Sequence, residues 1–279
     1  MIPLPELLRF ITEDAPSGDL TTRALAPLGR CRARVFLRET GVVAGVEEAA
    51  ALFTHFGVTV LSAVPDGTVV EADATLLSLE GDAAPVLLVE RTALNLIGRM
   101  SGIATLTRAL VEAAHREDPA VRVAATRKTA PGLRLLDKKA VVLGGGDPHR
   151  ANLSYGILVK DNHLALIPLD EALHRARTRG GGKPVEVEVS TIPGALTAAE
   201  LGADTIMLDN MDLHSLRAVI ADLRKRGLRD RVEIEISGGI TPENIARYAA
   251  LGPDRISVGR LTHSPRSLDV SLEVTPAPE

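Results

Sequence analysis

Cationic side chains are concentrated in residues 125–163, although the formal net charge of the whole protein is -4. The charged cations of this stretch are Arg127, Lys128, Arg134, Lys138, Lys139, Arg150 and Lys160, with His149 and His163 as further candidates. Guanidinium groups present a flat fork of donors and ammonium groups a compact charge, and both bind carboxylates and phosphates. The stretch predicts a site for an anionic small molecule, and a solvated basic loop is the alternative interpretation.

Lysine usage supports the first interpretation. Only six residues are lysine, and four of them lie within residues 125–163. Because arginine serves as the general cation of this chain, a lysine at a strand position, such as Lys160, is favoured as a functional residue.

Short apolar runs alternate with helical segments from about residue 120 onward. We predict strands at 121–126, 157–160, 185–189, 205–209, 232–237 and 255–259, and helices near 169–179, 193–201, 212–226 and 242–250. Asp212 and Thr241 are the expected N-caps of the last two helices. Such alternation is typical of parallel strands joined by crossover helices. Glu186 and Glu188 share one face of their strand, which indicates a barrel with a polar interior or mouth.

Polar residues or glycines follow each predicted strand. They are Thr126, Arg127, Lys128, Lys160, Glu188, Asp209, Ser237, Gly238, Gly239 and Gly259. The active site of an α/β barrel lies at the carboxyl ends of its strands. The ends of these strands therefore predict one shared pocket.

Phosphate and metal binding are predicted within this pocket. Ser237, Gly238 and Gly239 precede the helix that Thr241 would cap, and Gly259 closes the next strand, as phosphate loops do; plain turns are the alternative. Glu188 and Asp209 are candidate ligands for Mg2+ or for sugar hydroxyls.

The first hundred residues have a different pattern, that of a small α+β unit. Residues 85–115 are predicted to be helical with a break near Ser101 and Gly102, and Arg91 lies inside an apolar helix. Such a helix implies burial or an interface, and a buried cation there needs a ligand or an acidic partner, such as Glu90.

The composition excludes several classes of protein. Aromatic residues make up 2% of the chain and the net charge is acidic, which argues against a nucleic-acid surface. The only cysteine, Cys31, cannot form an intramolecular disulfide and fits a reducing compartment. No apolar run has the length of a membrane span, and the N-terminus lacks the pattern of a signal peptide. We expect a cytoplasmic protein.

The motifs, taken together, resemble a known family. They are Glu13-Asp14 with Gly18-Asp19 and Thr21, Glu90-Arg91-Thr92, Ser101-Gly102 with Thr105, Thr126-Arg127-Lys128-Thr129, Gly144-Gly145-Gly146 with His149-Arg150, Lys160-Asp161-Asn162-His163, Glu186 with Glu188, Asp209-Asn210, Ser237-Gly238-Gly239 and Thr262-His263-Ser264. In this order and spacing the set resembles quinolinate phosphoribosyltransferase, the carboxylating nicotinate-nucleotide pyrophosphorylase family of NAD synthesis.

The resemblance implies an α/β protein with an N-terminal α+β sandwich domain and an incomplete (β/α) barrel. We place the domains at residues 1–105 and 106–264, with a tail at 265–279 that returns to the first domain. The family reaction converts quinolinate and phosphoribosyl pyrophosphate to nicotinate mononucleotide, pyrophosphate and CO2, with Mg2+. The implied assembly is a homodimer with shared active sites, and a higher oligomer is left open.

The resemblance also implies a role for each residue. Arg91 would reach in from the partner subunit, and Thr126, Arg127, His149, Arg150 and Lys160 would bind quinolinate. Lys128 would lie near the phosphoribosyl donor, and Glu188 and Asp209 would bind the ribose hydroxyls and the metal. Ser237, Gly238, Gly239 and Gly259 would surround the 5′-phosphate. Lys128, Lys160, Glu188 and Asp209 are the expected catalytic residues.

Three positions depart from the family pattern. Ala125 stands where the family usually has aspartate, Pro148 precedes His149 after Asp147, and Arg260 follows Gly259. Proline at this position is shared with a related protein associated with molybdenum transport. This relative, or another pyridine phosphoribosyltransferase, is the first alternative. A barrel aldolase that uses Lys160 as a Schiff-base amine and a non-enzymatic ligand-binding protein are the other two.

Overall fold

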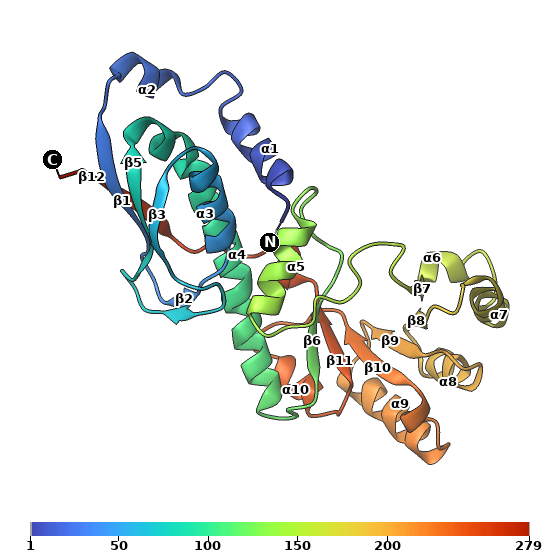
Figure 1. Cartoon of the computed structure of the whole chain (residues 1–279). Coiled ribbons are helices and arrows are strands. Elements are labelled where there is room, and N and C mark those ends of the chain that lie inside the picture. The colour runs from blue at the N-terminus through green and yellow to red at the C-terminus, as the bar shows by residue number, and fades with distance from the viewer. Residues whose placement is uncertain (1, 279) are drawn as a thin grey trace. The chain divides into compact units, whose positions relative to one another are not determined.

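A six-stranded parallel sheet follows the predicted alternation of strands and helices (Figure 1). Its strands are β6 (Arg122–Ala125), β7 (Ile157–Val159), β8 (Val185–Val189), β9 (Thr205–Asp209), β10 (Glu233–Ser237) and β11 (Arg255–Val258). The order in the sheet is β6-β11-β10-β9-β8-β7. A closed barrel would also pair β6 with β7, and within residues 2–278 the sheet has no such pairing. The predicted incomplete (β/α) barrel is therefore confirmed.

Helices follow most of these strands. They are α6 (Asp161–Leu164), α7 (Leu169–Arg179), α8 (Ile192–Glu200), α9 (Leu213–Lys225), the 3-10 turn η1 (Arg229–Arg231), α10 (Ile245–Ala249) and α11 (Arg260–His263). Apolar strand residues such as Val187, Ile206, Ile234 and Ile256 are fully buried and form the core of this sheet.

The predicted helix caps have different outcomes. Asp212 caps α9, since its carboxylate accepts a hydrogen bond from the Ser215 amide at 2.9 Å. Thr241 is not a cap, because α10 begins only at Ile245. The side chain of Asn244 accepts from the Thr241 amide and donates to the carbonyl of Gly239, at 2.8 and 2.9 Å. These hydrogen bonds hold residues 239–244 in a polar turn, and the helix begins only after this turn.

The computed structural model describes residues 2–278, which divide into two compact units. The parallel sheet belongs to the unit formed by residues 109–131 and 146–264. The other unit contains the described residues up to 108, residues 132–145 and the described residues from 265 onward.

This other unit is built on an antiparallel sheet of order β12-β1-β5-β3. Its strands are β1 (Arg30–Leu37), β3 (Thr59–Ala63), β5 (Thr75–Asp82) and β12 (Val270–Pro276), with β2 (Gly41–Val42) and β4 (Val69–Val70) paired separately. Its helices include α1 (Leu4–Asp14), α2 (Leu20–Leu25), α3 (Val46–His55) and α5 (Arg134–Leu143). Helix α3 packs against β3 and β5, and Phe36, Phe53 and Leu77 are fully buried in the core.

Helix α4 (Ala83–His115) is continuous, so the predicted break near Ser101 and Gly102 is wrong. A Cβ atom on Gly102 would lie 1.9 Å from the carbonyl oxygen of Arg266. Glycine is therefore required at this position because the backbone of Arg266 passes close to the helix, and it does not mark a helix end. The side chain of Arg91 is exposed and forms no ion pair within the described part of the chain, so the alternative of a salt bridge to Glu90 is not observed. Among the described helices, none combines the length and apolar composition that a membrane span requires.

Candidate active site

The carboxyl ends of the parallel strands line a single cavity of about 410 Å³. The predicted site residues that it brings together are Thr126, Arg127, Lys128, His149, Arg150, Lys160, Glu188, Asp209, Ser237, Gly238 and Gly239. Two predicted residues do not line it. Gly259 lies behind Lys128, since a Cβ atom on the glycine would lie 3.3 Å from Lys128 Cδ. Arg91 belongs to the other unit.

Strand register accounts for this convergence. Strands β8, β9 and β10 run parallel, with Val189 opposite Leu208 and Asp209 opposite Ser237. Parallel strands in this register expose their carboxyl ends at one edge of the sheet. Short strands that end in polar residues therefore deliver those residues to the same edge.

Two arginines supply positive charge to the cavity. The Nε atom of Arg127 is buried and has no hydrogen-bond partner within residues 2–278. Burial lowers the pKa of the Arg150 guanidinium, and the nearby charge of Arg127 lowers it further, against the opposing effect of Glu186. An unpaired buried guanidinium nitrogen next to a second guanidinium group is costly unless an anion binds between or beside them. The pair therefore favours an anionic ligand.

Two carboxylates face the same cavity. Glu188 is ion-paired with Lys160, and Asp209 accepts a hydrogen bond from the Asn210 side chain at 2.6 Å. Neither carboxylate is fully buried. They provide oxygen ligands of the kind that Mg2+ and sugar hydroxyls accept.

The loop after β10 requires its glycines. Gly238 has φ +103°, and a Cβ atom there would lie 2.3 Å from Asn210 Oδ1. Gly239 has φ +60°. The sequence interpretation placed a helix N-terminus at this loop, but α10 begins only at Ile245. A phosphate site here would rest on loop amides and not on a helix dipole.

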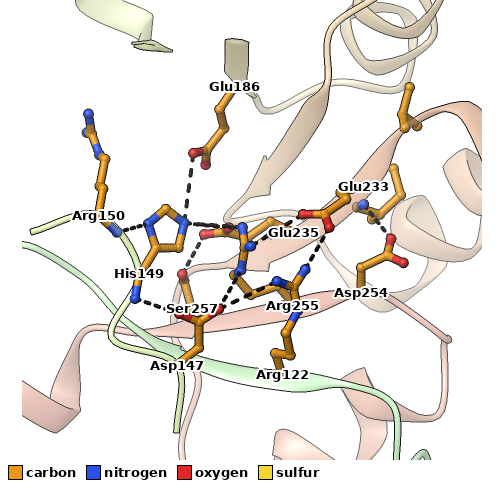
Figure 2. A network of polar contacts seen from close by, with 12 residues as sticks. Arg122, Asp147, His149, Arg150, Glu186, Glu233, Glu235, Asp254, Arg255 and Ser257 are labelled. Carbon is orange, nitrogen blue, oxygen red and sulfur yellow. Dashed lines mark hydrogen bonds and ion pairs between the residues drawn. The ribbon is translucent and has the colours of Figure 1, made fainter. Parts of the chain in front are cut away.

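A buried polar network beneath the cavity includes residues that the sequence interpretation did not assign (Figure 2). Glu235 is fully buried and bonds to His149, Arg255 and Ser257. The shared face of Glu233, Glu235 and Ser237 was the only sequence signal for it. Arg255 gave none, because its role depends on pairing between β10 and β11.

The two buried glutamates of this network have opposite pKa shifts. Burial tends to raise the pKa of Glu235, but hydrogen bonds from His149, Ser257 and Arg255 outweigh it and lower the pKa to about 2. Burial raises the pKa of Glu186 to about 7, and the charge of Glu235 adds to this effect. One carboxylate of the network is thus held ionised by its donors.

Two groups of metal-ligating side chains already contain a protein cation. Beside His149, Glu186 and Glu235 lies the guanidinium of Arg255, 2.9 Å from Glu235. In the other unit, Lys139 Nζ lies 2.8 Å from both Glu47 and Glu48 and 3.1 Å from Asp66. Burial opposes the charge of Lys139, but the hydrogen bonds that it donates to these carboxylates raise its pKa. In each group a cationic side chain of the protein already contacts the carboxylates.

Comparisons with known proteins agree with this geometry. The family model for the C-terminal domain of quinolinate phosphoribosyl transferase matches residues 103–273, and the model for its N-terminal domain matches residues 19–101. A probable nicotinate-nucleotide pyrophosphorylase [carboxylating] of Methanothermobacter thermautotrophicus is 45% identical over 268 residues, covering 95% of this chain and 96% of that protein. The nicotinate-nucleotide pyrophosphorylase [carboxylating] of Mycobacterium leprae is 40% identical and covers 95% of each chain.

A solved structure with a similar sequence has the same fold. The crystal structure of nicotinate-nucleotide pyrophosphorylase from Ehrlichia chaffeensis superposes with a TM-score of 0.91 at 31% identity, covering 96% of this chain and 97% of that one. The match extends over both units. The chain therefore belongs to the quinolinate phosphoribosyl transferase family.

Proposed function

We propose that this protein transfers the phosphoribosyl group of phosphoribosyl pyrophosphate to quinolinate, giving nicotinate mononucleotide, pyrophosphate and CO2 for NAD biosynthesis. The names of its relatives, nicotinate-nucleotide pyrophosphorylase [carboxylating], support this activity. The observation that carries it is the single cavity in which Arg127, Arg150 and Lys160 lie together with Glu188 and Asp209. A dicarboxylate and a polyphosphate need several cations, and a developing ribosyl cation needs carboxylates.

The cationic residues bind and orient quinolinate in this proposal. Thr126, Arg127, Arg150 and Lys160 form its site, with His149 next to Arg150, and Lys128 lies toward the phosphoribosyl donor. Ser237, Gly238, Gly239 and Gly259 bind the 5′-phosphate. Holding the ring nitrogen close to C1 of the ribose turns a reaction between two molecules into one within a complex.

The chemical steps then need charge balance more than covalent catalysis. The ring nitrogen attacks C1 as the C1–oxygen bond to pyrophosphate breaks, and Glu188 and Asp209 stabilise the positive charge on C1. The C–C bond to the 2-carboxyl group breaks next. Its electron pair remains on the ring carbon beside the quaternary nitrogen, and this carbon takes a proton as CO2 leaves.

The donor chemistry of the cavity fits Mg2+. Mg2+ is usually held by one or two carboxylates together with the phosphates of a substrate. Glu188 and Asp209 are the residues that would hold it, and it would neutralise the charge of the departing pyrophosphate.

We also propose a cytoplasmic homodimer with shared active sites, in which Arg91 of one subunit enters the cavity of the other. The exposure of Arg91, a cation without an ion pair in the described chain, supports this arrangement. The single cysteine supports a reducing compartment.

The test uses the purified protein with carboxyl-labelled quinolinate, phosphoribosyl pyrophosphate and Mg2+. Labelled CO2 and nicotinate mononucleotide are expected in equal amounts, and neither should form without the phosphoribosyl donor. A folded protein that binds nicotinate or a nucleotide but leaves quinolinate unchanged would instead indicate the molybdenum-associated branch of the family.

A further inference from the structure

Both ring nitrogens of His149 are engaged inside the protein. The backbone amide of Arg150 lies 2.7 Å from Nδ1, and Glu235 Oε2 lies 3.0 Å from Nε2. A backbone N–H is always a donor, so Nδ1 must accept and carries no proton. The single ring proton is therefore on Nε2 and is donated to Glu235. In this arrangement neither ring nitrogen is left for a ligand.

Charged groups on several elements surround the ring. Arg255 Nη1 lies 2.9 Å from the same Glu235 oxygen and 3.3 Å from His149 Nε2. Arg255 therefore contacts the carboxylate that also binds the imidazole. The remaining charged groups near the ring are Glu186 on β8, with its Oε2 3.8 Å from Nε2, and Asp147 and Arg150 on the same loop.

Asp147 contacts both the backbone of His149 and the side chain of Arg255. Its Oδ1 accepts from the His149 amide at 2.7 Å, and its Oδ2 lies 3.4 Å from Arg255 Nε. Arg255 therefore contacts the acid that holds the backbone of His149 and the acid that holds its ring (Figure 2).

The loop that carries His149 is fixed to the sheet in an unusual conformation. The backbone of Asp147 pairs with β6, through bonds of 2.8 Å to the Val123 carbonyl and 3.0 Å from the Ala125 amide. His149 has φ +51°, a region that costs free energy for a residue other than glycine. The contacts of Asp147, Glu235 and Arg255 hold His149 in this strained conformation. The conformation of His149 in turn orients the next residue, Arg150.

The geometry points to a positioning role: we infer that His149, anchored by Arg255 through Glu235 and Asp147, does not bind the substrate but fixes Arg150 for anion binding. This inference deepens the proposed function and rests on it for the identity of the anion, quinolinate. Arg127, Arg150 and Lys160 then carry the recognition of its carboxylates. His149 acts on affinity only through the backbone of Arg150.

The first test reads the tautomer of His149 in the free protein, without any substrate. In protein labelled with 15N-histidine, the His149 signals are assigned by comparison with His149→Asn, which removes them. We expect one protonated and one unprotonated ring nitrogen near neutral pH, with the proton on Nε2. Two protonated nitrogens, or a proton on Nδ1, would overturn the inference even if the enzyme is fully active.

The second test is a double-mutant cycle on quinolinate affinity. His149→Ala should weaken binding by about ten-fold, the value of one lost hydrogen bond, and should have little effect once Arg150 is already alanine. Independent effects that add in the double variant would show direct contact with quinolinate and overturn the inference. kcat should change less than KM in His149→Ala, because the effect is on binding.

A conservative variant separates positioning from charge. Asparagine tolerates positive φ, and its side-chain oxygen can accept from the Arg150 amide, so His149→Asn should bind quinolinate better than His149→Ala. Equal losses in the two variants would contradict the inference. If wild-type protein releases no CO2 from quinolinate, the proposed function fails while the tautomer measurement still decides the role of His149.

Discussion

The ammonium group of Lys160 and the carboxylate of Glu188 form an ion pair across the carboxyl ends of the neighbouring strands β7 and β8. The Lys160 side chain is 41% exposed and that of Glu188 13% exposed. The pair links a group proposed to bind quinolinate with a group proposed to stabilise the ribosyl cation. In the proposed reaction, a quinolinate carboxylate bound to Lys160 would replace Glu188 as its partner and leave Glu188 available for C1.

We predict that Glu188→Gln lowers kcat by about 10²–10³-fold, because a neutral amide cannot stabilise positive charge on C1. Quinolinate should still bind, since Lys160 loses only its internal partner. Steady-state kinetics with both substrates measure this. The matched control is Glu200→Gln, which removes a surface carboxylate paired with Arg226 and should leave kcat unchanged. An active Glu188→Gln enzyme would remove Glu188 from the catalytic residues.

We predict that Arg91→Ala and Lys160→Ala are each inactive and that a mixture of the two regains part of the activity. Arg91 is exposed on α4, so its loss should not unfold the protein. In a shared site, a mixed dimer combines the intact Arg91 of one subunit with the intact Lys160 of the other. The assay is CO2 release after the variants are mixed and allowed to exchange subunits. Failure to regain activity, with exchange verified by mass, would mean that Arg91 does not act across an interface.

We predict that Glu235 makes stability depend on acid pH. Its pKa is about 2 in the folded protein, below the ordinary value of 4.5, so the unfolded chain binds the proton more readily. The ionised Glu235 carboxylate contributes on the order of 3 kcal/mol to the free energy of unfolding. This contribution is complete above about pH 4.5 and disappears as the pH falls through 2. Urea unfolding of wild type and Glu235→Gln at neutral pH and near pH 3 measures it. The gap in unfolding free energy between the two proteins should narrow in acid, and a constant gap would contradict this assignment.

We predict that Gly102→Ala destabilises the protein. Helix propensity alone would favour alanine over glycine by about 1 kcal/mol, so the expected effect is opposite to the intrinsic preference. The new methyl group would lie 1.9 Å from the Arg266 carbonyl oxygen, and overpacking of this kind costs roughly 1–3 kcal/mol or more. Gly98→Ala is the graded control, because its methyl group would lie 2.9 Å from the Leu268 carbonyl and should cost less. Chemical unfolding of the wild type and the two variants gives the order of their unfolding free energies. A Gly102→Ala protein more stable than the wild type would show that the backbone at Arg266 can move away from the helix.

The strands and the convergence of their ends could be predicted from sequence because both depend on local patterns. Alternating apolar residues mark each strand, and parallel strands with polar carboxyl ends place those ends together. For this reason the sequence predicts that Lys160, Glu188, Asp209 and Ser237 share one pocket, and all four line the same cavity.

Other features depend on contacts between distant residues and could not be predicted. Gly102 suggests a helix break unless one knows that the Arg266 backbone crosses it. Arg255 carries no motif, and its role arises only from the pairing of β11 with β10 and from the neighbouring Asp147 loop. His149 was assigned to the substrate by resemblance, whereas the hydrogen bonds of its two nitrogens are visible only in the folded chain.

The pairing of β12 with β1 has a consequence for synthesis on the ribosome. Residues 30–37 emerge early, but their partner strand at 270–276 is among the last to be made. At usual elongation rates, roughly 10 to 40 s separate the end of β5 from β12. During that interval one edge of the nascent β1 has no partner, and a chaperone that shields this edge would protect the growing chain from pairing with its neighbours on the same messenger RNA.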